Sequence, residues 1–117
     1  MKLIDKEIIE LQKGCKGSCC VILNDDINKL ESKALISAGC TQKELEEMLK
    51  QEKEYFVIEG IDEITIDMQE IYYQIVKDRQ YNGKELSKDA VIVFTIKDKE
   101  SLKNIMYELY NLCVVAF

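Results

Sequence analysis

The stretch AVIVFTI at residues 90–96 decides the fold, because no side of it can face water without exposing large apolar side chains. A Lys-Asp pair bounds it on each side, at residues 88–89 and 97–98. Its valines and isoleucines are β-branched, which favours a strand. A short apolar run between polar residues can also be a buried helical segment, and periodicity alone does not distinguish the two. In either form, we expect this stretch in the middle of the core.

Downstream of this stretch, the apolar spacing changes to that of a helix. From Leu102 to Ala116, apolar residues recur every three or four positions, as on one helical face. The Asp98 carboxylate can act as an N-cap by accepting hydrogen bonds from first-turn amides. The sequence therefore predicts an amphipathic helix at this end of the chain. Residues 114–117 read VVAF and are too apolar for a frayed tail, so we expect them to dock on their own domain or on a second subunit.

Upstream, glycines at positions 14, 17, 39, 60 and 83 separate four more segments with helical spacing. Glycine is a poor helix residue and is common where helices end. The predicted helices span residues 3–13, 18–38, a segment that begins at 41, and 61 to about 80. Thr41, followed three residues later by Glu44, is a capping-box pattern. Asn82-Gly83 is a turn signal that ends the last of these helices.

These patterns predict a mainly α fold, a compact bundle of about five to six amphipathic helices. In this bundle Ser87 caps a central buried helix that contains residues 90–96. The alternative is an α+β domain with a small sheet built from residues 55–58, 64–66 and 90–96. We favour the bundle because the glycines fall between helical patterns. A chain of 117 residues fits a single domain, residues 1–117.

Composition narrows the function classes. The chain has 16 basic and 22 acidic side chains, a formal charge of −6, and Arg79 as its one arginine. Because affinity for a phosphate backbone comes from Lys and Arg, we expect no nucleic-acid ligand. No run approaches the roughly 18 apolar residues of a membrane span, so we expect no membrane partner. Five cysteines and no signal-peptide pattern favour a cytoplasmic protein with reduced thiols.

The absence of histidine is the strongest negative signal for catalysis. It removes the usual general base, the commonest metal ligand and the proton switch that works near neutral pH. The segment Gly14-Cys15-Lys16-Gly17-Ser18 has neither the spacing nor the preceding strand of a phosphate-binding loop. We therefore expect no catalytic residues, no cofactor and no enzymatic activity.

The cysteines at positions 15, 19 and 20 form the one cluster with reactive potential. If Ser18 begins a helix, Cys19 and Cys20 lie in its first turn, where the helix dipole favours thiolates. Cys15, Cys19 and Cys20 could then act as a redox sensor or bind a soft metal ion. Cys40 and Cys113 lie far away in sequence, on or beside apolar faces, where cysteine behaves as a small hydrophobic residue.

Aromatic side chains on the predicted helices are the other candidate site. One tyrosine of each neighbouring pair should project away from the core-facing side, and exposed tyrosines are good interface anchors. The predicted function is a non-catalytic protein-interaction or assembly module that binds a protein partner or associates with itself. The candidate interface residues are Tyr72, Tyr73, Tyr107, Tyr110, Val114, Val115 and Phe117.

Overall fold

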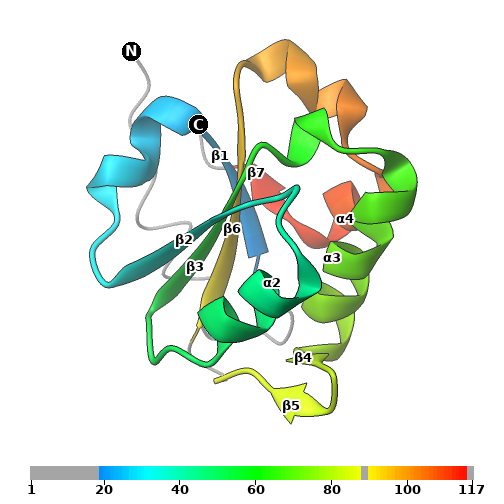
Figure 1. Ribbon diagram of the computed structural model, residues 1–117. Coiled ribbons are helices and arrows are strands. Elements are labelled where there is room, and N and C mark those ends of the chain that lie inside the picture. The colour runs from blue at the N-terminus through cyan, green and yellow to red at the C-terminus, as the bar shows by residue number, and fades with distance from the viewer. Residues whose placement is uncertain (1–18, 88–89, 116–117) are drawn as a thin grey trace.

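The computed structural model describes residues 19–87 and 90–115 and has an α/β fold built on a five-stranded parallel sheet (Figure 1). The strand order is β2-β3-β6-β1-β7, and each neighbouring pair is parallel. The strands of this sheet are β1 (Cys19–Leu23), β2 (Lys33–Ser37), β3 (Tyr55–Glu59), β6 (Val91–Ile96) and β7 (Val114–Val115).

Helices and a short hairpin connect these strands. The α-helices are α2 (Gln42–Leu49), α3 (Ile66–Asp78) and α4 (Tyr107–Leu112), and the 3-10 helices are η1 (Asn24–Lys29), η2 (Ile61–Glu63) and η3 (Lys99–Asn104). β4 (Gln80–Tyr81) and β5 (Lys84–Glu85) form an antiparallel hairpin between α3 and β6. None of the helices in the described part of the chain is long and apolar enough to cross a membrane.

The apolar run at residues 90–96 forms the central strand of the sheet. β6 lies between β3 and β1, and all six of its residues are buried. An unbroken run rich in β-branched residues is typical of a parallel strand that is covered on both faces. Its central position in the core is confirmed, whereas the central helix predicted for it is wrong.

The predicted bundle of five to six helices is wrong for a second reason, which concerns residues 18–38. In place of one long helix, the structure has β1, η1 and β2. Residues 19–23 read CCVIL, and the first four of them are buried. A helix that lies on a core buries one face, whereas a central strand of a parallel sheet buries every side chain. The helical spacing of three and four fits only some of the apolar residues in this continuous run.

The alternative α+β sheet is correct in two of its three strands. Residues 55–58 lie in β3 and residues 91–96 form β6, but residues 64–66 do not form a strand. Thr65 is the N-cap of α3, and its hydroxyl oxygen accepts a hydrogen bond from the Met68 amide at 3.2 Å. Because the sheet is parallel and helices connect its strands, the fold is α/β rather than α+β.

The predicted helix caps at Thr41 and Asp98 are confirmed, whereas the cap predicted at Ser87 is wrong because the strand β6 follows in place of a helix. Thr41 and Glu44 form a capping box, with bonds of 3.2 Å from the Glu44 amide to Thr41 Oγ1 and 3.0 Å from the Thr41 amide to Glu44 Oε1. Asp98 caps η3 through the Ser101 amide at 3.0 Å. The single helix predicted to follow Asp98 is divided into η3, α4 and then β7.

The two faces of the sheet bury different side chains. Cys19 and Val21 of β1 pack in the cluster that also contains buried residues of α2, α3 and α4, which lie on one side of the sheet (Figure 1). Cys20 and Ile22 belong to a cluster on the opposite face, against which Ile27 of η1 packs. The strand register aligns one apolar row across that face, made of Leu35, Val57, Val93, Cys20 and Val114.

A buried glutamine links several backbone segments of the helical layer by hydrogen bonds. Gln69 of α3 is fully buried, and its Nε2 donates to the carbonyl oxygens of Ile61 at 3.1 Å, Ile64 at 3.3 Å and Asn104 at 2.8 Å. Its Oε1 accepts from the Met106 amide at 2.6 Å. One side chain therefore satisfies backbone groups of η2, of the segment after it and of the connection between η3 and α4.

Replacing Gln69 with Leu should lower the free energy of unfolding by about 2–4 kcal/mol, because buried backbone groups lose their partner while the side-chain size is nearly kept. Equilibrium unfolding in urea measures the loss. The control is Gln74→Leu on the exposed side of the same helix, where the amide bonds only Glu70. The control should stay within about 0.5 kcal/mol of the wild type. Equal effects of the two substitutions would contradict this role of Gln69.

Candidate functional site

One hollow of the described surface lies between α2, α3 and the β4–β5 hairpin. This hollow of about 260 Å³ has Leu45 and Tyr72 in its lining, together with Met68 and Ile71 of α3. Met68 is 40% exposed and Ile71 is 47% exposed. Large apolar side chains that stay exposed beside a hollow are typical of a surface that binds another molecule.

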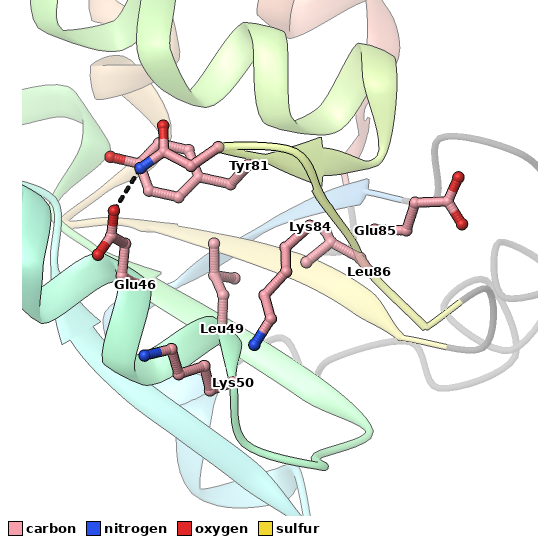
Figure 2. Close-up of a pocket in the computed structure, with 8 residues that line it drawn as sticks. Glu46, Leu49, Lys50, Tyr81, Lys84, Glu85 and Leu86 are labelled. Carbon is pink, nitrogen blue, oxygen red and sulfur yellow. Dashed lines mark hydrogen bonds between the residues drawn. The ribbon is translucent and has the colours of Figure 1, made fainter.

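A second hollow, of about 300 Å³, lies between α2 and the hairpin (Figure 2). Leu49 rises into it from α2, while Leu86 and Lys84 project into it from the opposite segment. Glu85 points away from it. Glu46 accepts a hydrogen bond from the side-chain Nδ2 of Asn82, and this bond joins the hairpin turn to α2. This hollow therefore has apolar walls and charged groups of both signs around it.

Tyr81 is common to a group of neighbouring hollows. It lines both of them and also a third hollow, of about 380 Å³, that extends along α3 past Ile71 and Asp78. Its hydroxyl oxygen is buried and has no hydrogen-bond partner in the described structure. We name this group of hollows the hairpin groove and define it by Leu45, Leu49, Met68, Ile71, Tyr81 and Leu86.

A helix cap and a hairpin turn position the segments that form the groove. The capping box at Thr41 starts α2, and the predicted turn at Asn82-Gly83 is confirmed as the two-residue loop of the hairpin. Asn82 has φ 51° and Gly83 has φ 80°, and both residue types tolerate the positive φ that such loops require. The turn sends the chain back along α2, so Tyr81 and Leu86 come to lie beside Leu49.

Arg79, the one arginine of the chain, forms hydrogen bonds with the segment that follows this hairpin. Arg79 lies in the left-handed conformation at the end of α3, with φ 56°. Its Nη2 donates to the Ser87 carbonyl at 2.7 Å and to the Ala90 carbonyl at 2.8 Å. Burial lowers the pKa of the guanidinium from its usual value. The side chain that could have bound phosphate therefore holds the connection that leads into β6.

The first pair of candidate interface tyrosines lies on α3, and its members have different environments. Tyr72 is buried, and its hydroxyl donates to the Ala38 carbonyl at 2.6 Å. Its ring meets Phe94 edge to face, with centroids 6.0 Å apart. Burial and the neighbouring Cys40 sulfur raise the pKa of the Tyr72 phenol. Tyr73 is half-buried, and the Lys77 ammonium lies 5.8 Å from the centre of its ring.

The other candidate interface residues lie near the end of the chain. On α4, Tyr107 is 74% exposed and Tyr110 is 38% exposed. Val114 and Val115 form β7 and are half-buried. Phe117 lies outside the described residues. The structure therefore places exposed aromatic rings on α4 and puts Tyr72 in the core, so the candidates do not share one face.

The strand at residues 19–23 separates two members of the proposed thiol cluster. Cys19 is joined to Cys113 in a disulfide, with the Cα atoms 4.9 Å apart. Cys20 lies on the opposite face, and burial raises the pKa of its thiol to about 12. Cys15 lies outside the described residues. Across residues 19–87 and 90–115, no three His, Cys, Asp or Glu side chains come together as a metal site.

The carboxyl edge of the sheet is where open parallel sheets usually bind ligands. The segment that follows β1 there is η1, which reads NDDINK. Asp26 within it is buried, and one of its carboxylate oxygens has no hydrogen-bond partner in the described structure. A phosphate-binding loop needs closely spaced glycines and a Lys-Ser or Lys-Thr pair. η1 has neither and carries two acids, so it does not match a phosphate-binding loop of this kind.

No family model matches this sequence, and a search of curated proteins finds no match to it. The hairpin groove, the exposed face of α4 and the Cys19–Cys113 pair are therefore the features from which a function can be inferred.

Replacing Cys113 with Ser should lower the free energy of unfolding of the oxidised protein by about 2–4 kcal/mol, because the disulfide closes a long loop in the unfolded chain. Its two cysteines are 94 positions apart. Thermal unfolding with and without a reductant measures the effect. The wild type and the Cys40→Ser control should both lose stability on reduction, whereas the Cys113→Ser protein should not respond. A reductant response that survives in Cys113→Ser would contradict this assignment.

Proposed function

We propose that the protein is a non-catalytic protein-interaction module that binds an amphipathic helix of a protein partner in the hairpin groove. The observation that carries the proposal is the exposure of Met68 and Ile71 at the edge of an apolar hollow. A groove of this kind takes the apolar side chains that a partner helix presents at spacings of three, four and seven.

The surroundings of the groove suit a protein better than a small molecule. The adjoining hollows form an extended feature along α2 and α3 rather than one enclosed cavity. Glu46, Lys50 and Lys84 provide both signs of charge around its apolar part. An apolar centre with a polar rim is the usual organisation of a protein interface.

A binding role also agrees with the chemistry of the chain. Without histidine, a nucleophile in the groove would lack its commonest activating base. Two polar side chains beside the groove already have structural partners. Tyr72 bonds Ala38, and Glu46 bonds Asn82. We therefore assign no catalytic residue and no cofactor, and we place the protein in the cytoplasm as part of the same proposal.

Self-association through α4 is the second form that this function can take. Tyr107, Tyr110 and Leu112 are all exposed on one short helix. Aromatic side chains of this kind are common anchors in interfaces. Val114 and Val115, directly after α4, would extend the same contact. This use of α4 stays a prediction, and a partner bound in the hairpin groove does not depend on it.

Site-specific photo-crosslinking in the native cell tests the groove. A benzophenone amino acid in place of Gln74, which lines the third hollow, should give one discrete adduct with a protein partner. The same probe in place of the exposed Lys103 in η3 should not give that adduct. Adding Ile71→Glu to the Gln74 probe should remove the adduct, because a charge then lies at the apolar edge. An adduct that persists in the Ile71→Glu protein would refute the proposal.

A thiol-disulfide switch is the second candidate function, and the Cys19–Cys113 disulfide favours it. In a cytoplasmic protein, disulfides are rare and are usually transient or redox-sensing. In thiol-disulfide exchange, two glutathione molecules would reduce the protein disulfide to two thiols and would form one glutathione disulfide. Reduction would remove the covalent link between Cys113 and β1, so that strand pairing alone would hold β7 to β1.

Equilibration in glutathione buffers, followed by alkylation and mass analysis, gives the reduction potential of this pair. A regulatory switch should titrate near the cytosolic glutathione potential, about −220 to −260 mV. A structural disulfide should instead have a potential below about −300 mV. The Cys113→Ser protein is the control and should show no two-electron transition of Cys19. A potential in the structural range would remove the switch as a function and would leave the groove proposal untouched.

A further inference from the structure

β2 forms one edge of the sheet and is a long strand for an edge position. It has five residues and pairs with β3, and no other strand in residues 19–87 and 90–115 pairs with it. The strand at the other edge, β7, has two residues. Short edge strands limit pairing with other molecules, whereas a long open edge offers a row of backbone donors and acceptors.

The hydrogen bonds at the two ends of β2 show which of its backbone groups face outward. The Tyr55 amide donates to the Ser32 carbonyl at 3.2 Å, and the Ala38 amide donates to the Glu59 carbonyl at 2.8 Å. Even-numbered residues therefore face β3. Because backbone groups alternate along a strand, the amides of Lys33, Leu35 and Ser37 and the carbonyls of Lys33 and Leu35 face the open edge. The Ser37 carbonyl already accepts from the Cys40 amide at 3.0 Å.

The usual protection of an edge strand is absent from the middle of β2. Natural edges carry outward charges, prolines or bulges that prevent pairing. The one charge in β2 is Lys33, and its ammonium donates to the Leu30 carbonyl at 3.0 Å, at the start of the strand. The next five residues, 34–38, read ALISA. Leu35 at the centre of β2 is 47% exposed.

We propose that β2 pairs with β2 of a second copy of this chain, antiparallel and with the two Leu35 residues opposite each other on a twofold axis. In this register Lys33 lies opposite Ser37 of the other copy, and the outward-facing residues of both strands meet. The two Leu35 residues can exchange two backbone hydrogen bonds on the axis, and each Lys33 carbonyl can accept from the Ser37 amide of the other copy. The two five-stranded sheets then form one continuous sheet.

The side chains of β2 complement themselves in this register. Leu35 extends the apolar row that runs through Val57 and Val93, so two such rows meet at the axis. Each Lys33 lies opposite a serine, and the two lysines are at opposite ends of the contact. Like charges directly opposite each other destabilise a strand pair, and this arrangement has none. Self-complementarity of this kind is what a twofold interface requires.

The second copy is a better occupant than an unrelated extended segment, because the same five residues supply both halves of the contact. The interface is small and belongs to the weak class that buries less than about 1,200 Å². We therefore expect a reversible dimer whose population rises with concentration. This inference concerns the backbone edge of β2 and does not depend on the hairpin groove.

Sedimentation and amide hydrogen exchange on the purified full-length chain, over a range of concentrations, test the pairing. The amides of Lys33, Leu35 and Ser37 should exchange rapidly in the dilute monomer and slow down as the dimer forms. The amides of Ala34 and Ile36 should be protected at every concentration, because they bond β3. The alternation of protected and unprotected amides is the signature of edge pairing.

Leu35→Lys should abolish the dimer without changing the unfolding temperature of the monomer, because it places two ammonium groups opposite each other at the axis. The matched control is Ile66→Lys on α3, where the isoleucine is 53% exposed, and this variant should still dimerise. Ile71→Glu should dimerise normally as well. A failure of the groove proposal can therefore be distinguished from a failure of β2 pairing.

Three results would overturn the inference. The first is a protein that stays monomeric at the highest concentration. The second is a dimer that persists in Leu35→Lys. The third is slow exchange of the Leu35 amide in the monomer, which would show that the edge is covered within one chain. A dimer lost in Ile66→Lys and kept in Leu35→Lys would instead assign the contact to the helical surface.

Discussion

Complete burial of β6 is the constraint on which the rest of the structure depends. Six consecutive buried residues need a neighbouring strand on each side and a layer on each face. β3 and β1 supply the strands, and parallel pairing then requires crossover connections in place of tight hairpins. α2, α3 and α4 belong to those connections, so the helical layer and the grooves on it follow from the central strand.

Three local signals in the sequence predict the structure correctly. The capping box at Thr41 and Glu44, the turn at Asn82-Gly83 and the central burial of residues 90–96 each depend on a few neighbouring residues. The parallel sheet was not predicted, because its pairings join residues that are far apart along the chain. The run at 19–23 contains both helical and strand spacings, and only its partners, β6 and β7, decide between them.

The candidate site was harder to predict than the fold because it is assembled from three segments. Leu49, Ile71 and Tyr81 each look like ordinary apolar residues of an amphipathic element, and only the packing of α2, α3 and the hairpin brings them together. The tyrosine candidates failed to form one face for a related reason. Neighbouring residues of a helix point about 100° apart, so Tyr72 entered the core while Tyr73 did not.

Three buried polar side chains already form hydrogen bonds to the backbone. Gln69 satisfies η2 and the start of α4, Arg79 holds the segment before β6, and Thr95 accepts from the Gly60 amide at 3.1 Å. A group that gives up such a bond to bind a substrate would leave a buried partner unsatisfied, at a cost of about 1–3 kcal/mol. Apolar side chains at the surface carry no such cost. We therefore expect docking at the groove, at the exposed face of α4 and at the open edge of β2.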